Sequence, residues 1–313
     1  MGKLAFVFPG QGAQTVGMGK EFYEGYDLGK KLFDEADEAL GYSIRKLCFE
    51  GPAEELTLTA NTQPAILTVS VIAASLLRER GIMPEVAAGH SLGEYSALVL
   101  AGVLDFQDAV RLVHKRGAFM QEAVPVGEGA MAAVLGLERD KIVAVCEEIS
   151  QESPVQAVNF NCPGQTVIAG AKAGVEKATE ALSAAGTAKC VILPVSAPFH
   201  STLMAPAARK LAAELDKVEI RDAAFPVVSN YTGELESKAA EIKENLVKQA
   251  DHPVKWEDCM AAMVAFGATH FVEAGPGKTL CGFNKRIDRT LKNMNVENPV
   301  SLEKTLDTLK EVR

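Results

Sequence analysis

The sequence predicts an α/β fold built around one strand, one tight turn and one helix. A short apolar run at residues 86–88 leads into Gly89-His90-Ser91-Leu92-Gly93, and a helical pattern follows at once. Apolar strand-like runs alternate with helical patterns over most of the chain, which is typical of a parallel sheet covered by helices. From residue 130 the order changes to β-α-β-β-α-β, which indicates a compact insert.

The main α/β part is described by the elements on either side of the insert. Its strands are expected at residues 4–8, 86–88, 226–229 and 270–273. Its helices before the insert are expected at residues 20–41, 63–80, 92–102 and 106–123. Asp105 is expected to cap the last of these helices, because an aspartate side chain accepts hydrogen bonds from free amides of the first turn.

The insert has its own strands and helices. Its strands are expected at residues 130–135, 155–160, 166–169 and 190–195, and its helices at 139–150 and 173–185. This order is the split βαβ pattern of ferredoxin-like folds. The helix-rich alternation resumes after Pro198, so the insert lies within a larger α/β domain.

Composition narrows the class of protein. A chain of 313 residues suits one large or two unequal domains, and its net charge of −9 argues against nucleic-acid binding. No uninterrupted apolar run approaches the roughly 20 residues that span a bilayer, and the N-terminus is too short for a signal peptide. The six cysteines form neither a C-x-x-C pair nor a zinc spacing. We therefore expect a cytoplasmic protein with no metal, no cofactor and no membrane contact.

Ser91 is the candidate nucleophile. In a G-x-S-x-G turn between a strand and a helix, the flanking glycines remove side chains that would clash, and the serine oxygen stands clear of the backbone. The helix that follows directs unpaired amides toward the place where an oxyanion would form. The alternative is a serine that only caps a helix in a glycine-rich turn.

A serine nucleophile needs a base, and the chain has five histidines. His200 follows Ala197-Pro198-Phe199 at the start of a helix, a loop position typical of catalytic groups. His90 is expected to point away from Ser91 in a tight turn, and His114 lies beside two basic residues on a helix, which favours the surface. On the sequence alone, His200 is favoured only modestly over the other four.

Arg116 lies 25 residues after Ser91, with one helix on each side of the turn at 102–105. An ordinary solvated helix arginine is the common case. Two consecutive helices in an α/β layer can instead return this arginine over Ser91.

Two glycine-rich stretches invite a nucleotide-binding interpretation that does not hold. Gly10-Gln11-Gly12 follows a strand, but Thr15 occupies the third glycine position of a dinucleotide fingerprint. In the stretch 275–279, the first glycine of a phosphate-binding loop would fall on Val272. The first stretch is better explained as a loop whose amides face the serine turn.

These motifs together resemble one family. The order of the motifs is that of malonyl-CoA:acyl carrier protein transacylases, and the resemblance runs from end to end; the motifs are Gly10-Gln11-Gly12-Ala13-Gln14, Thr62-Gln63-Pro64-Ala65, Gly89-His90-Ser91-Leu92-Gly93, Arg116, Ala197-Pro198-Phe199-His200 and Glu273-Ala274-Gly275-Pro276-Gly277. The resemblance implies an α/β-hydrolase-like large subdomain, residues 1–122 and 197–313. It also implies an inserted ferredoxin-like small subdomain, residues 123–196.

The resemblance assigns roles to particular residues. It makes Ser91 the nucleophile and His200 its base. It also implies that the backbone carbonyl of Gln249, and not a carboxylate, orients the histidine. The amides of Gln11 and Leu92 would form the oxyanion hole. Further assignments are Arg116 for the malonyl carboxylate, Phe199 for excluding an α-methyl group, and Gln63 and Asn161 for the lining of the cleft.

The implied activity is ping-pong transfer of a malonyl group from malonyl-CoA to the phosphopantetheine thiol of acyl carrier protein, in support of fatty-acid synthesis. The enzyme is expected to be a monomer. The carrier protein would meet a basic face, either Lys285-Arg286 with Arg289 and Lys292, or Arg209-Lys210, although solvated helix faces are as common. Competing possibilities are a serine thioesterase or esterase that uses the same turn, and a scaffold without catalysis.

Overall fold

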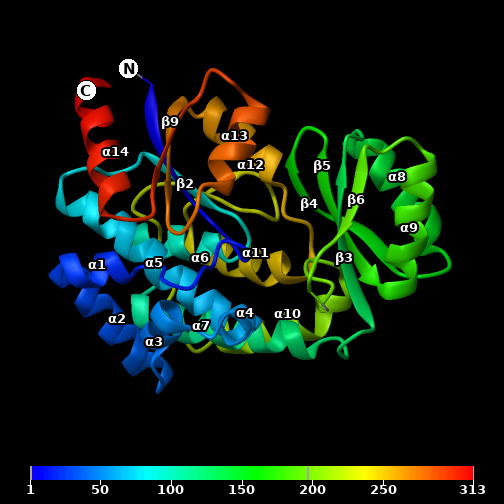
Figure 1. The fold of residues 1–313 in the computed structure, drawn as a ribbon, viewed down its shortest axis with the longest axis horizontal. Coiled ribbons are helices and arrows are strands. Elements are labelled where there is room, and N and C mark those ends of the chain that lie inside the picture. The colour runs from blue at the N-terminus through cyan, green and yellow to red at the C-terminus, as the bar shows by residue number, and fades with distance from the viewer. Residues whose placement is uncertain (1, 196, 313) are drawn as a thin grey trace.

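The chain folds around two separate β-sheets in the computed structural model, which describes residues 2–195 and 197–312 (Figure 1). The smaller sheet and its two helices, coloured green, lie at one end of the molecule, and the larger sheet with most of the helices forms the rest. Ser196, the last residue of the expected small subdomain, lies outside the described residues, as do Met1 and Arg313. The α/β class and the two-part architecture expected from the sequence are confirmed.

The elements that the structure describes follow in chain order. The strands are β1 (Lys3–Phe8), β2 (Val86–Gly89), β3 (Gly129–Leu135), β4 (Val155–Cys162), β5 (Gln165–Ala171), β6 (Lys189–Ile192), β7 (Val227–Val228), β8 (Leu235–Glu236), β9 (Ala268–Ala274) and β10 (Lys292–Val296). The helices before the small sheet are α1 (Lys20–Gly25), α2 (Asp27–Leu40), α3 (Ile44–Glu50), α4 (Ala53–Thr57), α5 (Thr59–Glu79), α6 (Gly93–Leu100) and α7 (Phe106–Glu122). The others are α8 (Arg139–Ser150), α9 (Lys172–Ala184), the 3₁₀ turn η1 (Thr202–Met204), α10 (Ala205–Leu215), α11 (Ala239–Asp251), α12 (Trp256–Ala265), α13 (Thr279–Ile287) and α14 (Pro299–Val312).

The larger sheet has the strand order β10-β9-β1-β2-β7-β8, and only the pairing of β7 with β8 is antiparallel. Strand β1 lies inside this sheet, and its side chains alternate between two cores. Phe6 and Phe8 pack on the face covered by α5, whereas Ala5 and Val7 pack on the opposite face, against residues of α12 and α13. Because both faces are covered, the strand is apolar from Leu4 to Phe8, after the partly exposed Lys3 at its start.

Helix α5 is the central helix of the larger core. By length and composition it is the one helix among the described residues that could cross a membrane, and 89% of its apolar stretch is buried inside the structure. Inspection of the sequence missed this, because Thr62, Gln63 and Thr68 interrupt the apolar run. These polar residues are themselves buried.

The smaller sheet has the strand order β4-β5-β3-β6 and is antiparallel throughout. Helices α8 and α9 cover one face. The other face contributes Met131 and Val158 to a core shared with Met120 of α7 and with Phe199. The expected ferredoxin-like order is confirmed, but the last strand ends at Ile192 and not at residue 195, because Pro194 cannot donate to the sheet.

One expected helix is divided. The pattern at residues 20–41 forms α1 and α2, which meet at Tyr26 in an extended conformation (φ −138°, ψ 133°). The apolar spacing continues across this break, so periodicity alone did not reveal it. The expected cap at Asp105 is confirmed, since its Oδ1 accepts from Gln107 N at 3.0 Å.

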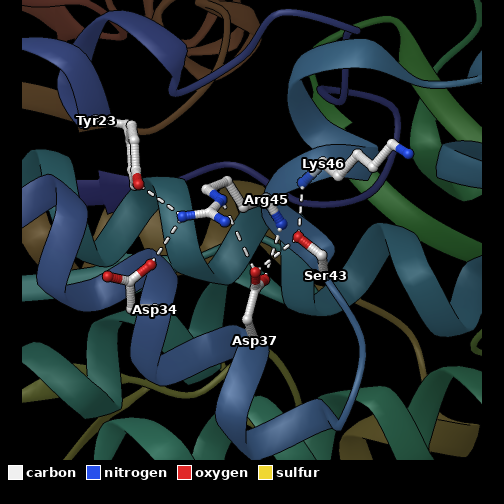
Figure 2. A network of polar contacts seen from close by, with 6 residues as sticks. All are labelled: Tyr23, Asp34, Asp37, Ser43, Arg45 and Lys46. Carbon is white, nitrogen blue, oxygen red and sulfur yellow. Dashed lines mark hydrogen bonds and ion pairs between the residues drawn. The ribbon is translucent and has the colours of Figure 1, made fainter.

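A polar network fastens α3 to α1 and α2 (Figure 2). Asp37 accepts from Ser43 Oγ at 2.7 Å and from Arg45 N at 3.0 Å, so one carboxylate holds the loop between α2 and α3. Arg45 Nη1 donates to Tyr23 Oη at 2.6 Å and to Asp34 Oδ1 at 2.9 Å. These contacts, most of them partly buried, connect helices around the larger core.

Candidate active site

Ser91 stands at the sharp turn between β2 and α6. Its φ of 53° lies in the left-handed region, which L-residues with side chains rarely adopt. A Cβ at Gly89 would collide with the backbone of Gly93, and a Cβ at Gly93 would collide with Phe8 O, so both glycines are needed. Ser91 N donates to Asn230 Oδ1 at 2.6 Å. The turn thus holds a strained serine in a single position.

His200 meets Ser91 from a distant part of the chain. Its Nε2 lies 2.7 Å from Ser91 Oγ, and its Nδ1 lies 2.8 Å from the backbone oxygen of Gln249. A carbonyl oxygen only accepts, so Nδ1 carries the proton and Nε2 presents its lone pair to the serine hydroxyl. Burial, and after it the positive charge of Arg116, lower the pKa of His200 to about 3. The imidazole is therefore neutral over the physiological pH range.

Arg116 is brought over Ser91 by α7 and is only 1% exposed. Its Nη2 donates to Ser91 Oγ at 3.2 Å and to Gln249 Oε1 at 2.9 Å, and its Nη1 donates to Gln63 Oε1 at 2.8 Å. Its Nε has no hydrogen-bond partner among the described residues, and none of the partners named here is a carboxylate. The site therefore holds a buried cation that has no carboxylate among these hydrogen-bond partners, which suits an anionic ligand group.

A buried carboxyl lies behind these side chains. Glu94, in the first turn of α6, is fully buried, and its Oε2 accepts from Asn230 N at 2.8 Å and from Gln249 Nε2 at 2.9 Å. Burial, and after it the neighbouring carboxyl of Glu236, raise the pKa of Glu94 to about 8. Sequence analysis missed Glu94 and Asn230. A glutamate in an otherwise apolar helix, directly after the serine turn, was the available signal.

The amides of Gln11 and Leu92 lie beside the serine turn. Gln11 lines the cavity at Ser91, and Leu92 is the N-terminal cap residue of α6. Within residues 2–195 and 197–312, neither backbone amide donates to another protein group. Two unpaired donors next to a serine hydroxyl can stabilise a developing oxyanion.

These residues open onto one cavity of about 120 Å³. The smaller sheet contributes to its lining, together with α5, α7 and the loops beside them; the lining comprises Gln11, Gln63, His90, Ser91, Arg116, Met120, Met131, Asn159, Leu193, Val195, Phe199 and His200. A second hollow of about 380 Å³ shares Gln11, His90 and Asn159 with the cavity and continues to Thr279, Leu280 and Phe283 on α13. Ser91 thus lies at the inner end of a channel.

The remaining candidates from the sequence are placed as follows. His90 Nε2 lies 2.8 Å from Asn161 Oδ1, on the second sheet, and not against the serine hydroxyl. Asn161 lines the outer hollow. His114 is half-buried, and its Nδ1 lies 2.8 Å from Ala60 O, so the expectation of a surface residue was only partly right.

The stretch at 275–279 has a structural explanation. Glu273 is fully buried and accepts from the backbone amides of Leu280, at 3.1 Å, and Cys281, at 2.8 Å. A carboxylate of the chain itself therefore caps the start of α13, where a phosphate-binding loop would leave free amides. The described residues also include no group of three or more His, Cys, Asp or Glu side chains suited to a metal ion.

Comparison with known proteins agrees with this geometry. The family model described as "Acyl transferase domain" matches residues 5–309. The chain is 51% identical over 312 residues to the malonyl CoA-acyl carrier protein transacylase of Bacillus subtilis, with 99% of this chain and 98% of that protein covered.

Solved structures are equally similar. A Vibrio cholerae acyl carrier protein S-malonyltransferase has a TM-score of 0.95 and 46% identity, covering 97% of this chain and 99% of that one. A malonyl-transacylase solved in complex with its type II PKS acyl-carrier protein has a TM-score of 0.95 and 45% identity, and the match covers 98% of this chain and 99% of that one. The chain belongs to the acyl transferase family, among the malonyl CoA-acyl carrier protein transacylases.

Proposed function

We propose that this enzyme transfers a malonyl group from malonyl-CoA to the thiol of acyl carrier protein through a malonyl ester on Ser91. One observation carries the assignment of roles: Ser91 Oγ lies 2.7 Å from a neutral imidazole nitrogen of His200 and 3.2 Å from a guanidinium nitrogen of Arg116. The first contact activates a hydroxyl. The second lies within reach of the carboxylate at the far end of a three-carbon acyl group.

In the first half-reaction, His200 Nε2 takes the proton of Ser91 Oγ as the oxygen attacks the thioester carbonyl. The carbonyl oxygen becomes an oxyanion, which the amides of Gln11 and Leu92 stabilise. One such donor contributes about 10²–10³ in rate. The C–S bond breaks, the thiolate of coenzyme A takes the proton from His200, and Ser91 is left as a malonyl ester.

In the second half-reaction, the thiol of acyl carrier protein enters by the same channel. His200 takes its proton, the sulfur attacks the ester carbonyl, and Ser91 Oγ leaves with the proton returned to it. The backbone carbonyl of Gln249 keeps Nδ1 protonated throughout, so Nε2 alone exchanges protons. A backbone carbonyl thereby does the orienting work that a carboxylate does in a Ser-His-Asp triad.

Arg116 selects the acyl group. A malonyl carboxylate provides the anionic partner that this buried guanidinium lacks among its hydrogen bonds. An acetyl group would leave the cation without a counter-charge. Phe199, which lines the cavity, would crowd a substituent on the α-carbon. The alternative of a serine esterase or thioesterase is not favoured, because the relatives compared above are transacylases.

Acyl carrier protein would dock over α13. This helix lines the outer hollow through Thr279, Leu280 and Phe283, and its next turn exposes Lys285 and Arg286. The other candidate, Arg209-Lys210 on α10, has no residue in the lining of that hollow, and Lys210 is paired with Glu122 at 2.9 Å. The enzyme is further proposed to act as a monomer in the cytoplasm.

The chain would divide into a large subdomain, residues 1–122 and 197–313, and a small subdomain, residues 123–196. Support comes from the two sheets, which have separate cores on their outer faces. The cavity at Ser91 draws on both parts, with Ser91 from one and Asn159 from the other.

The test is a transfer assay with malonyl-CoA, holo acyl carrier protein and the purified chain. Malonyl-carrier protein should accumulate with release of coenzyme A, and free malonate should form far more slowly. Ser91→Ala should abolish the transfer. Free malonate as the main product would contradict the proposal and favour the thioesterase.

A further inference from the structure

Glu94 occupies the centre of a hydrogen-bond network that the proposed mechanism does not use. One oxygen, Oε2, accepts from Asn230 N and Gln249 Nε2, and the other, Oε1, has no partner among the described residues. A fully buried carboxyl next to a nucleophile turn calls for a functional explanation, since burial of such a group is costly.

The two partners of Glu94 contact the backbone of Ser91 and the side chains of Arg116 and His200. Asn230 accepts from Ser91 N at 2.6 Å and donates to Gly89 O at 2.7 Å. These two hydrogen bonds fix the backbone of the serine turn. Gln249 donates from Nε2 to Ser91 O at 2.9 Å and accepts from Arg116 through Oε1 at 2.9 Å. Its backbone oxygen accepts from His200 Nδ1.

Glu94 also helps to orient the Gln249 amide. Its Oε2 acts as an acceptor here, so Gln249 must present its NH₂ to Glu94 and its oxygen to Arg116. The reversed amide would place donors against donors at Arg116. The acceptors Glu94 Oε2 and Ser91 O on one side and the donor Arg116 on the other therefore favour the same direction for this chain of hydrogen bonds.

We propose that Glu94 is a positioning residue that, through Gln249, holds Arg116 in the orientation that binds the malonyl carboxylate. This inference rests on the proposed function, because it concerns the choice of acyl group at the same site. Glu94 touches neither the acyl group nor the nucleophile's oxygen. Replacing Glu94 should therefore change the preference for malonyl over acetyl donors, and not the formation or breakdown of the serine ester itself.

The ionisation of Glu94 provides a second way to test the proposal, through the pH dependence of donor selectivity. The ionisable groups that face it are Arg116 on α7, Glu236 on β8, Cys259 on α12 and its neighbour Tyr95. Burial raises the pKa of the Cys259 thiol well above its usual range and that of Tyr95 to about 12, and it raises the pKa of Glu236 to about 7. As pH rises through about 8, Glu94 ionises and its charge competes with the malonyl carboxylate for Arg116.

The experiment measures kcat/KM for malonyl and acetyl thioesters of N-acetylcysteamine, with wild type, Glu94→Leu and Glu94→Gln. Glu94→Leu should lower the malonyl-to-acetyl ratio about 10- to 100-fold, the scale of losing one buried hydrogen bond that orients a charged group. Glu94→Gln keeps an acceptor for Asn230 and Gln249 and should keep the ratio within about threefold. Glu273→Gln, which alters a buried carboxyl at the cap of α13, is the matched control and should leave the ratio unchanged.

If Glu94→Leu fails to fold, Glu94→Gln still tests the proposal through pH. In the wild type, the malonyl-to-acetyl ratio of kcat/KM should fall as pH rises through about 8. In Glu94→Gln, the ratio should stay constant over the same range. A folded Glu94→Leu with an unchanged ratio, or a Glu94→Gln that keeps the alkaline fall, would overturn the proposal. A wild-type enzyme that transfers no malonyl group at all would instead overturn the proposed function.

Discussion

Ser91 Oγ and His200 Nε2 face each other at 2.7 Å across 109 residues of sequence, and both residues have left-handed backbones. Their φ values of 53° and 62° are the only positive ones outside glycine in the part of the chain that the structure describes. Such conformations persist only where the surroundings enforce them. The strain of the backbone is thus concentrated on the two residues that we propose exchange a proton.

The low pKa of His200 has a kinetic consequence. With a pKa of about 3, the base stays neutral far below the ordinary histidine range, so the acid limb of kcat/KM should lie well below pH 6.5. The measurement uses the malonyl thioester of N-acetylcysteamine, which has no phosphate, and circular dichroism to confirm that the protein remains folded. A half-maximal rate near pH 6.5 would contradict the buried, neutral imidazole.

Arg116→Ala should lose malonyl transfer far more than acetyl transfer. Breaking a buried ion pair costs about 3–5 kcal/mol, so the malonyl-to-acetyl ratio of kcat/KM should fall by about 10²–10³. Arg111→Ala on the same helix is the control, because Arg111 is exposed and pairs only with neighbours such as Asp108 at 3.1 Å. Equal losses with both donors would rule out the proposed role.

Phe199→Ala should admit a branched donor. The wild-type ring lines the cavity and should penalise an α-methyl group by about 1–3 kcal/mol through overpacking. Steady-state rates with malonyl-CoA and methylmalonyl-CoA should show the ratio shifting toward methylmalonyl in the variant. Comparable turnover of the two donors by the wild type would contradict this assignment.

Charge reversal on α13 should impair the second substrate selectively. Lys285→Glu should raise KM for acyl carrier protein and weaken its dependence on salt, while hardly affecting formation of the malonyl enzyme from malonyl-CoA. Lys285 is preferable to Arg286, whose guanidinium donates to Pro163 O at 2.8 Å and Gln165 Oε1 at 2.9 Å. Lys177→Glu on α9 is the control. Unchanged kinetics with the carrier protein would remove α13 as the docking surface.

The sequence predicted those parts of the fold and site that depend on local patterns. The serine turn is encoded by Gly89 and Gly93 on either side of Ser91, and the cap of α7 by Asp105. The two helices joined by a short turn allowed Arg116 to return to Ser91 but did not require it, and its role came from the resemblance to the family. These features depend on residues close together in the chain, where spacing and residue type carry the information.

What the sequence did not reveal depends on contacts between distant segments. Asn230 reaches the serine amide from 139 positions away, and Gln249 reaches Glu94 from 155 positions away. No periodicity or motif records such a contact. The break at Tyr26 was missed for a related reason, since the apolar spacing continues from α1 to α2 while the backbone does not.

The most direct test of the account is mass spectrometry of the intact protein after brief exposure to malonyl-CoA, followed by peptide mapping. We predict one malonyl group per chain, located on Ser91, absent from Ser91→Ala and removed on addition of holo acyl carrier protein. A malonyl group on another residue, or transfer to the carrier protein that persists in Ser91→Ala, would contradict it.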